Sequence, residues 1–269
     1  MASMQTPNPL FREGWVEADG FRIRYMEAGQ GKPLIHLHGA DGMRLTRGHD
    51  LLSREFRVIA FEMPGFGSSP ENTRTKTMAE LAGSMAAAAR QLGIDKFGLI
   101  GTSFGGKVAL WLSVQEPERV EALVLEAPAA IRPIGSEPPS GSTQAMARGF
   151  YAHPERYDPL PEPDPAIQAK TRALVARLRG PDRDTDLENR LKGLAMPVLV
   201  LFGTLDCAIP PEMGRFYKQL LPNCHLVFVY DAGHAISTER PEAFAEVTVD
   251  FLNRHEAFVV NRAETVIHP

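Results

Sequence analysis

The chain has 269 residues, enough to bury one substantial core, and 43% hydrophobic with 23% charged residues is ordinary for a soluble globular protein. Its 29 basic and 33 acidic residues leave a net charge of −4. Because no basic run stands out, we expect a small-molecule substrate as partner, and neither nucleic acid nor a membrane.

The sequence shows no sign of a signal peptide, a membrane span or a disulfide. Residues 1–15 lack the basic start and the apolar core of 7–15 residues that are typical of a signal peptide. No uninterrupted apolar stretch reaches the length of about 20 residues that a membrane span needs. Cys207 and Cys224 have neither CxxC nor metal-ligand spacing, which favours two free thiols. The sequence therefore predicts a cytoplasmic protein without a metal site.

Apolar runs and helical patterns alternate along most of the chain. Residues 15–29 alternate apolar and polar side chains around Asp19-Gly20, which predicts a β-hairpin. Further strands are expected in the apolar runs at 34–42, 57–69, 97–103, 120–128, 197–206 and 225–234. Helical spacing marks 77–92, 106–115, 211–221 and 239–254. Strands this apolar, with helices between them, predict an α/β fold with a mostly parallel sheet covered on both faces.

A segment of different character interrupts this pattern from about Ile131 to Leu194. Its first half is rich in proline, and its second half holds two amphipathic helical patterns, DPAIQAKTRALVARLR and DTDLENRLKGL. A long insertion near strand ends often forms a lid, and the alternative is a surface insertion without a role. We expect a core domain of residues 1–130 and 195–269, with a helical cap at 131–194.

Residues 101–105, Gly-Thr-Ser-Phe-Gly, fit the G-x-S-x-G motif between an expected strand and an expected helix. In that motif the serine stands on a strained bend, so glycines must flank it to avoid collisions of Cβ atoms. The alternative is a plain turn in which Ser103 only caps the helix. The context favours Ser103 as a nucleophile.

A serine nucleophile needs a general base that a third group orients. His234 follows the last expected strand and Asp206 follows the strand before it, which gives the chain order Ser, acid, His of this motif. Glu126, at the end of the strand before the insertion, is a rival for the acid. The other histidines lie in segments without such a site. For the oxyanion we expect the backbone N–H groups of Phe104 and Ala40.

The motifs HLHGADG, EMPGFGSS, GTSFGG, GTLDCAIP and DAGHAI occur in this order across nearly the whole chain and resemble those of the α/β-hydrolase fold family. The resemblance implies an eight-stranded, mostly parallel sheet with a helical cap inserted after strand six. It also implies a Ser103–Asp206–His234 triad with its oxyanion hole, and no metal or organic cofactor is called for. Glu62 departs from the pattern, because the D-x-P-G-x-G-x-S loop more usually begins with Asp.

Similar proteins include carboxylesterases and C–C bond hydrolases of ring-cleavage products. The C–C hydrolases usually carry Trp directly after the catalytic histidine, where this chain has Ala235. We therefore expect a serine hydrolase that cleaves small, mainly apolar carboxylic esters through an acyl-enzyme on Ser103. One alternative is a C–C hydrolase, whose acidic substrate would need a cationic anchor from Arg172, Arg177 or Arg179. The other is a non-catalytic receptor for a small ligand. The substrate-binding residues and the oligomeric state stay open.

Overall fold

The computed structural model describes residues 10–137, 143–157, 164–255 and 258. At its start, β1 (Arg12–Ala18) and β2 (Phe21–Ala28) form the antiparallel hairpin that the sequence predicts. The two turn residues, Asp19 and Gly20, have φ values of 49° and 68°. Positive φ at both positions gives the turn a twist that matches the strands, which is why an Asp-Gly pair stands there.

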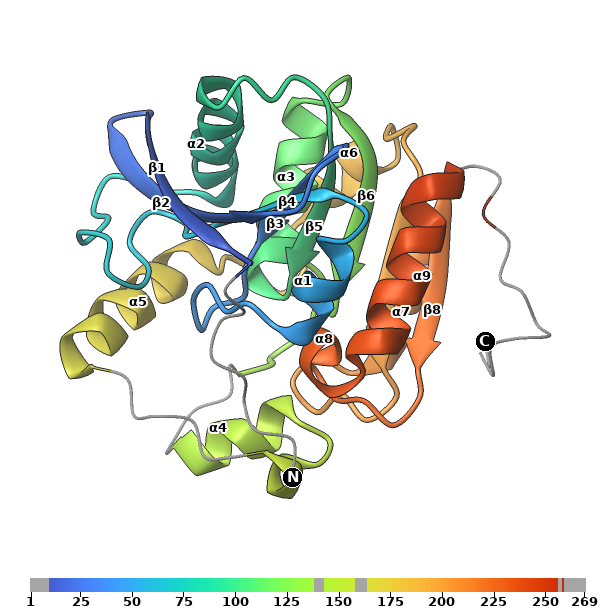
Figure 1. Cartoon of the computed structure of the whole chain (residues 1–269). Coiled ribbons are helices and arrows are strands. Elements are labelled where there is room, and N and C mark those ends of the chain that lie inside the picture. The colour runs from blue at the N-terminus through green and yellow to red at the C-terminus, as the bar shows by residue number, and fades with distance from the viewer. Residues whose placement is uncertain (1–9, 138–142, 158–163, 256–257, 259–269) are drawn as a thin grey trace.

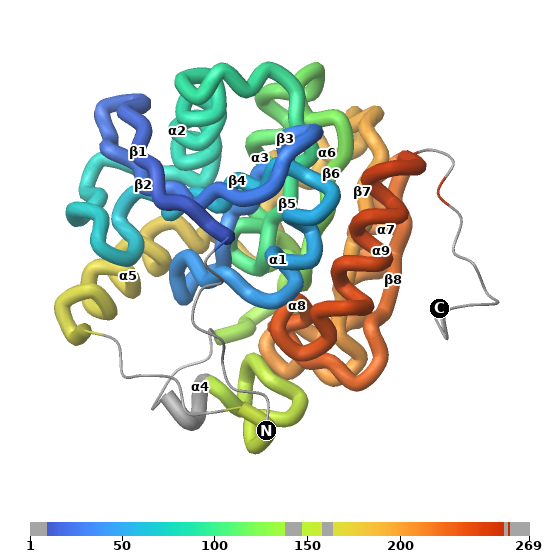
Figure 2. The backbone as a smooth tube through the Cα atoms, viewed as in Figure 1, coloured from blue at the N-terminus to red at the C-terminus, as the bar shows by residue number. Residues whose placement is uncertain are grey.

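One eight-stranded sheet runs through the molecule in the order β1-β2-β4-β3-β5-β6-β7-β8 (Figures 1 and 2). Its other strands are β3 (Pro33–Leu37), β4 (Arg57–Phe61), β5 (Phe97–Thr102), β6 (Val120–Glu126), β7 (Val198–Gly203) and β8 (Cys224–Val229). β2 pairs antiparallel with β1 and with β4, and every other neighbouring pair is parallel. The mostly parallel sheet predicted from the apolar runs is confirmed.

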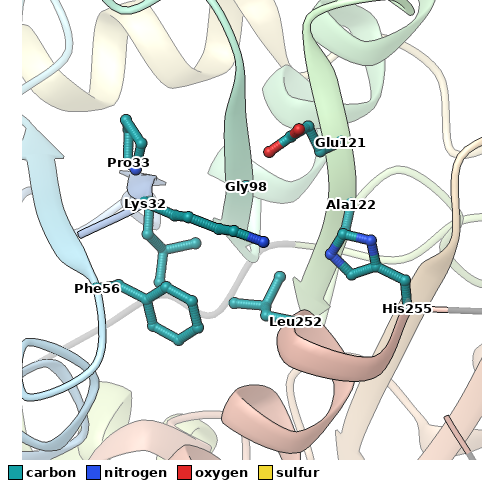
Figure 3. Close-up of a pocket in the computed structure, with 9 residues that line it drawn as sticks. Lys32, Pro33, Phe56, Gly98, Glu121, Ala122, Leu252 and His255 are labelled. Atoms are coloured by element: carbon teal, nitrogen blue, oxygen red, sulfur yellow. The ribbon is translucent and has the colours of Figure 1, made fainter. Parts of the chain in front are cut away.

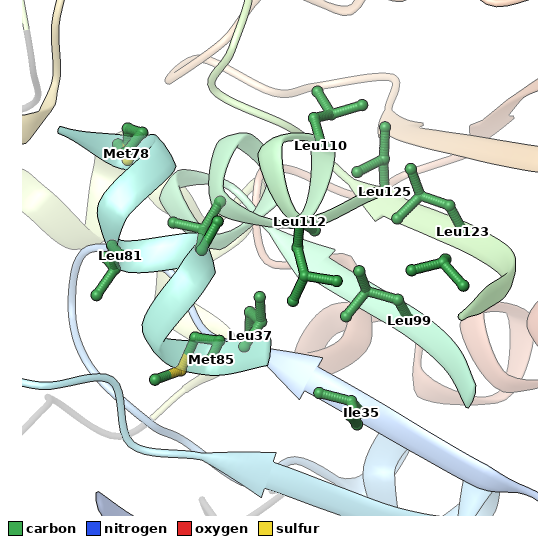
Figure 4. Close-up of a cluster of buried hydrophobic side chains, with 14 of the residues drawn as sticks. Ile35, Leu37, Met78, Leu81, Met85, Leu99, Leu110, Leu112, Leu123 and Leu125 are labelled. Atoms are coloured by element: carbon green, nitrogen blue, oxygen red, sulfur yellow. The ribbon is translucent and has the colours of Figure 1, made fainter. Parts of the chain in front are cut away.

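Helices cover both faces of this sheet. One face carries α2 (Met78–Gln91), α3 (Phe104–Gln115), α6 (Thr185–Leu191) and α7 (Gly214–Leu220). The other face carries α1 (Arg47–Leu52), α8 (Ile236–Glu239) and α9 (Pro241–Arg254). Figure 4 shows part of the first layer, where Leu99 and Leu123 of the strands meet Met85 and Leu112 of the helices. Strands buried on both faces need apolar side chains on both, which explains their nearly continuous apolar runs.

The chain leaves the sheet between β6 and β7. This segment forms α4 (Thr143–Phe150), the 3-10 helix η1 (Pro154–Arg156), α5 (Pro165–Leu178) and α6. The two amphipathic patterns are α5 and α6, as predicted, and α4 is an additional helix in the proline-rich half. α4 and α5 lie beyond the carboxyl ends of the strands (Figure 1), whereas α6 packs against α3. Residues 138–142 and 158–163, part of the proline-rich half, lie outside the described residues, and the division into core and cap domains stays a prediction.

Close packing of α3 against the sheet requires the glycines around Ser103. A Cβ atom on Gly105 would lie 2.2 Å from the carbonyl oxygen of Leu37, and one on Gly101 would lie 2.6 Å from the Cβ of Ala109. Real Cβ atoms essentially never come within 3.0 Å of such neighbours. The glycine spacing is therefore a condition for bringing the start of α3 against β3 and β5.

Replacement of Gly105 by Ala is expected to lower the free energy of unfolding by about 2–3 kcal/mol or to prevent folding, because the new methyl group overlaps backbone of β3. Gly83→Ala in α2 is the matched control, since its Cβ would have Gln115 Oε1, 4.0 Å away, as its only close neighbour. We expect this control to stabilise the protein by about 0.5–1 kcal/mol. Urea unfolding followed by circular dichroism measures both, and equal stability of the two variants would contradict the packing explanation.

Candidate active site

Ser103 lies on a strained bend between the end of β5 and the start of α3, with φ 52° and ψ −113°. Its N–H donates to the Glu126 carbonyl (2.9 Å), and its own carbonyl accepts from the N–H groups of Ala129 (2.9 Å) and Gly106 (3.0 Å). Ser103 occupies the position before α3, but its side chain makes no capping hydrogen bond. The hydroxyl is therefore not used to cap the helix, which was the alternative to a nucleophile.

Asp206 and His234 meet at the carboxyl edge of the sheet. Asp206 follows β7 and His234 follows β8, and His234 Nδ1 lies 2.9 Å from Asp206 Oδ2. The second carboxylate oxygen accepts the backbone N–H groups of Ala208 (2.8 Å) and Ile209 (2.9 Å). Only 4% of His234 and 6% of Asp206 is exposed. Because Nδ1–H of the neutral ring donates a hydrogen bond to Asp206, Nε2 carries no proton and can accept one.

The charges around His234 stabilise its protonated form. Burial lowers the pKa of the imidazole, but the charge of Asp206 and the hydrogen bond to it act in the opposite direction, joined by the charges of Glu126 and Asp41. The net effect is a pKa raised above its ordinary value of 6.5. These negative charges would stabilise the imidazolium that forms when His234 accepts a proton as a general base.

Glu126 does not take the place of Asp206. Its carboxylate accepts hydrogen bonds from the Thr102 hydroxyl (2.7 Å) and the Ser237 N–H (2.6 Å), and the histidine is bonded to Asp206. The carboxylate bonded to His234 is therefore that of Asp206 and not that of Glu126. Within the described residues no hydrogen bond joins the Ser103 hydroxyl to His234, and that contact stays part of the proposal below.

The loop after β3 lies beside Ser103. A Cβ built on Gly39 would lie 3.6 Å from the Ser103 Cβ, so Ala40 follows a residue that lies next to Ser103. Phe104 is the first residue of α3, where backbone N–H groups have no acceptor inside the helix. The two expected oxyanion donors are thus placed on segments next to Ser103, and their role stays a prediction.

His38 holds this loop in place, a role that we did not predict from the sequence. Its Nδ1 donates to the Gly39 carbonyl (2.7 Å) and its Nε2 accepts the Met63 N–H (3.0 Å). Burial lowers its pKa, so the ring stays neutral, as these two bonds require. His36 is buried as well. The sequence does contain a sign of this role, because two histidines lie inside the apolar run LIHLH. Histidines buried in such a run need polar partners that are buried as well.

The end of α4 and the residues that follow it contact the loop that carries His234. The Phe150 carbonyl accepts the backbone N–H groups of His234 (2.8 Å) and Ala235 (3.2 Å), and the rings of Phe150 and His234 lie 5.3 Å apart. The Glu239 carboxylate accepts the N–H of Ala152 (2.9 Å) from the same segment. The inserted segment therefore helps to fix the backbone of the histidine loop.

The three arginines considered as substrate anchors do not converge on this site. Arg177 donates to the carbonyls of Thr75 (3.0 Å) and Asn72, which ties α5 to the loop before α2. Arg179 is bonded to Ser136 and lies 3.3 Å from Asp182. Arg172 is exposed. Arg177 therefore ties the inserted segment to the core, and Arg179 makes its bonds within the segment.

Glu62 fits its loop in spite of the departure from the usual Asp. Its carboxylate accepts from Arg24 (3.2 Å) and from the Ser69 hydroxyl (3.1 Å). A Cβ on Gly67 would lie 2.2 Å from Glu62 Oε2, so the glycine leaves room for the longer acidic side chain. The loop therefore accommodates Glu62 at the position where Asp is usual.

A small pocket lies at the opposite edge of the sheet, where the parallel strands begin (Figure 3). Lys32, Gly98, Glu121 and His255 are among its lining residues, and its volume of about 10 Å³ is about that of one water molecule. It is too small for an organic substrate.

Among the described residues, no group of His, Cys, Asp and Glu side chains is placed to hold a metal ion. Nor does any helix among them have the length and apolar character needed to cross a membrane.

Comparison with known proteins agrees with this geometry. Residues 34–247 match the alpha/beta hydrolase family, and the chain belongs to it. It is 30% identical to a 2-hydroxymuconate semialdehyde hydrolase of Pseudomonas putida, over 95% of this chain and 98% of that protein. A 2-hydroxy-6-oxo-6-(2'-aminophenyl)hexa-2,4-dienoic acid hydrolase of Metapseudomonas resinovorans is 27% identical, with 90% and 91% covered. The naproxen esterase of Bacillus subtilis has a similar structure, with a TM-score of 0.73, 20% identity, and 91% and 93% covered.

Nuclear magnetic resonance of ¹⁵N-labelled histidines tests the charge environment of the site. We expect the imidazole of His234 to titrate with a pKa above 6.5, and Asp206→Asn to lower that pKa, because the variant removes the neighbouring negative charge. His49, whose pKa burial lowers to about 4, is the internal reference that stays neutral over this range in both proteins. A pKa of His234 below 6.5, or one that Asp206→Asn leaves unchanged, would contradict the assignment.

Proposed function

We propose that this protein is a serine hydrolase that forms an acyl-enzyme on Ser103 and cleaves a C–C bond in a ring-cleavage product of the 2-hydroxy-6-oxo-dienoic acid class. The observation that carries the hydrolase part is the 2.9 Å bond between Asp206 and His234, at the sheet edge where Ser103 bends. The substrate class is supported by two relatives that act on such compounds and match at least 90% of this chain.

The reaction follows from the roles of these groups. His234 accepts the proton of the Ser103 hydroxyl while the serine oxygen attacks the keto carbonyl, and the N–H groups of Ala40 and Phe104 bind the oxyanion. The bond can break once the enol proton of the substrate has moved to the carbon beside the keto carbonyl, which gives the diketo form. As the tetrahedral intermediate collapses, the C–C bond then breaks and its electron pair remains on that carbon, where it is delocalised into the neighbouring enone. The imidazolium of His234 protonates that carbon. Water, activated by His234, then hydrolyses the acyl-enzyme and releases the acid.

A carboxylate on the substrate needs a cation near the site. Arg44 lies four residues after Ala40, pairs with Asp41 (3.3 Å) and donates to the Tyr151 hydroxyl (3.0 Å) after α4. It therefore spans from the loop beside Ser103 to the inserted segment. Arg177 ties the inserted segment to the core and Arg179 is bonded within the segment, and we assign the anchoring role to Arg44 instead.

Hydrolysis of small, mainly apolar carboxylic esters is the second candidate. The same residues serve it, with an alcohol in place of the carbon leaving group. Ala235 favours this reaction, because the related C–C hydrolases usually have Trp after the catalytic histidine. A ligand receptor on the same fold would bind a small molecule without turnover.

Steady-state kinetics on a 2-hydroxy-6-oxo-dienoate and on p-nitrophenyl butyrate tests the proposal. We expect kcat/KM for the dienoate to exceed that for the ester by about tenfold or more, since only the dienoate carries the carboxylate that Arg44 binds. Ser103→Ala is expected to abolish both activities. By the behaviour of serine triads, Asp206→Asn is expected to lower kcat on the order of 10³- to 10⁴-fold.

Arg44→Ala separates the two substrates. We expect it to raise KM for the dienoate and to leave the ester unaffected, whereas Arg172→Ala, at an exposed position, is the matched control and changes neither. Faster turnover of the ester than of the dienoate would favour the esterase. Full activity of Ser103→Ala would refute the mechanism, and saturable binding without turnover of either compound would favour a receptor.

A further inference from the structure

Glu126, the last residue of β6, is bonded to both catalytic loops and is only 1% exposed. Its backbone carbonyl accepts the N–H of Ser103 (2.9 Å). One carboxylate oxygen accepts the hydroxyl of Thr102 (2.7 Å), the residue before the nucleophile. The other accepts the N–H of Ser237 (2.6 Å), three residues after His234. A single side chain therefore bridges the Ser103 bend and the His234 loop.

Two buried histidines fix the direction of these hydrogen bonds. The Thr46 N–H donates to His49 Nδ1 (3.1 Å), so the proton of a neutral His49 lies on Nε2 and is donated to His36 Nδ1 (3.1 Å). The proton of His36 then lies on Nε2 and is donated to the oxygen of the Thr102 hydroxyl (3.0 Å). That hydroxyl donates its own proton to Glu126. Each step follows from the one before, because a neutral imidazole has one donor and one acceptor.

The chain of donors ends on the carboxylate of Glu126, whose pKa stays above its ordinary value of 4.5 in spite of these bonds. Burial raises the pKa of Glu126, and the bonds from Ser237 and Thr102 together with the charge of His234 act against that rise. Burial also keeps both histidines neutral, since it lowers the pKa of His36 well below its ordinary value and that of His49 to about 4. His49, His36 and Thr102 form a relay of hydrogen bonds that ends on Glu126. Because both histidines of this relay are neutral, it places no positive charge next to Glu126.

Three acidic groups act on His234, each from a different loop. Asp206 follows β7 and is hydrogen-bonded to the ring, while Glu126 ends β6 and Asp41 lies in the loop after β3. Asp41 is exposed in part and is paired with Arg44 (3.3 Å), which offsets its charge. Glu126 is thus the buried acidic group, besides Asp206, whose negative charge acts on the imidazole.

We propose that Glu126 is a positioning residue of this active site, one that holds the Ser103 bend against the His234 loop and keeps a second negative charge near the imidazole. The proposal rests on the serine hydrolase function proposed above. Asp206 orients the ring of His234 directly, whereas Glu126 acts through the backbone of the two loops and through its charge.

Labelling of Ser103 by a fluorophosphonate tests this role without the natural substrate. The reagent reacts with a serine that a neutral histidine activates, so the labelling rate rises with pH as His234 loses its proton. Glu126→Gln has nearly the same shape and one negative charge fewer. We expect it to lower the pH midpoint of labelling by about half a unit or more and the plateau rate by about tenfold.

Two further variants separate charge from position. Glu126→Asp keeps the charge but is one methylene shorter, so the midpoint is expected to stay within about 0.2 units of the wild type while the plateau rate falls. Glu62→Gln is the matched control. It removes a carboxylate that is also buried but is bonded to Arg24 and Ser69, and we expect it to change neither quantity.

The outcomes distinguish the two proposals. If the wild-type protein is not labelled on Ser103, the serine hydrolase function itself is wrong. If Ser103 is labelled and Glu126→Gln keeps the wild-type midpoint and plateau, the positioning role is overturned and the hydrolase function stands. Should Glu126→Gln fail to fold, Thr102→Val tests the bridge with the charge intact: a plateau about tenfold lower at an unchanged midpoint supports it, and a wild-type plateau overturns it.

Discussion

The strained backbone of Ser103 is the constraint on which the rest of the structure depends. A residue other than glycine at φ 52° is unfavourable by itself and persists only where the surroundings fix it. Here Glu126, Ala129 and Gly106 bond its backbone from three sides, and the glycines around it let α3 approach the sheet. The hydroxyl at this bend makes no capping hydrogen bond to the helix it precedes. The close packing of α3 and the proposed chemistry therefore both require the strained backbone of Ser103.

The site also concentrates negative charge around one imidazole. Asp206 and Glu126 are both buried. Apart from the bond of Asp206 to the imidazole itself, their carboxylates accept hydrogen bonds from the backbone or from a hydroxyl and not from a lysine or arginine. Because these donors are neutral, the negative charges remain available to stabilise a protonated His234. The neutral histidines His36 and His49 have the same effect. Through His36 they donate a hydrogen bond to Thr102 and bring no positive charge to the site.

Much of this could be predicted from the sequence, where local signals carry the information. The Asp19-Gly20 turn, the apolar strands and the glycines around Ser103 reflect short-range rules, and the sheet has the predicted form. The approach of Asp206 to His234 followed from strand order. The relay could not be predicted, because Thr46, His36, Thr102 and Ser237 lie on different elements and their meeting depends on the packing of α1 and α8. The bonds of Arg177 to the core and of Arg179 within the inserted segment depend in the same way on tertiary contacts.

The most direct test of the central claim is to trap the covalent intermediate. The protein is mixed with p-nitrophenyl butyrate, quenched in acid before the steady state, and digested for peptide mass spectrometry. We expect a butyryl group on Ser103 in the wild-type protein, and its loss when His234 is replaced by Ala. Rapid turnover with the butyryl group on another residue, or undiminished acylation of Ser103 in His234→Ala, would contradict it.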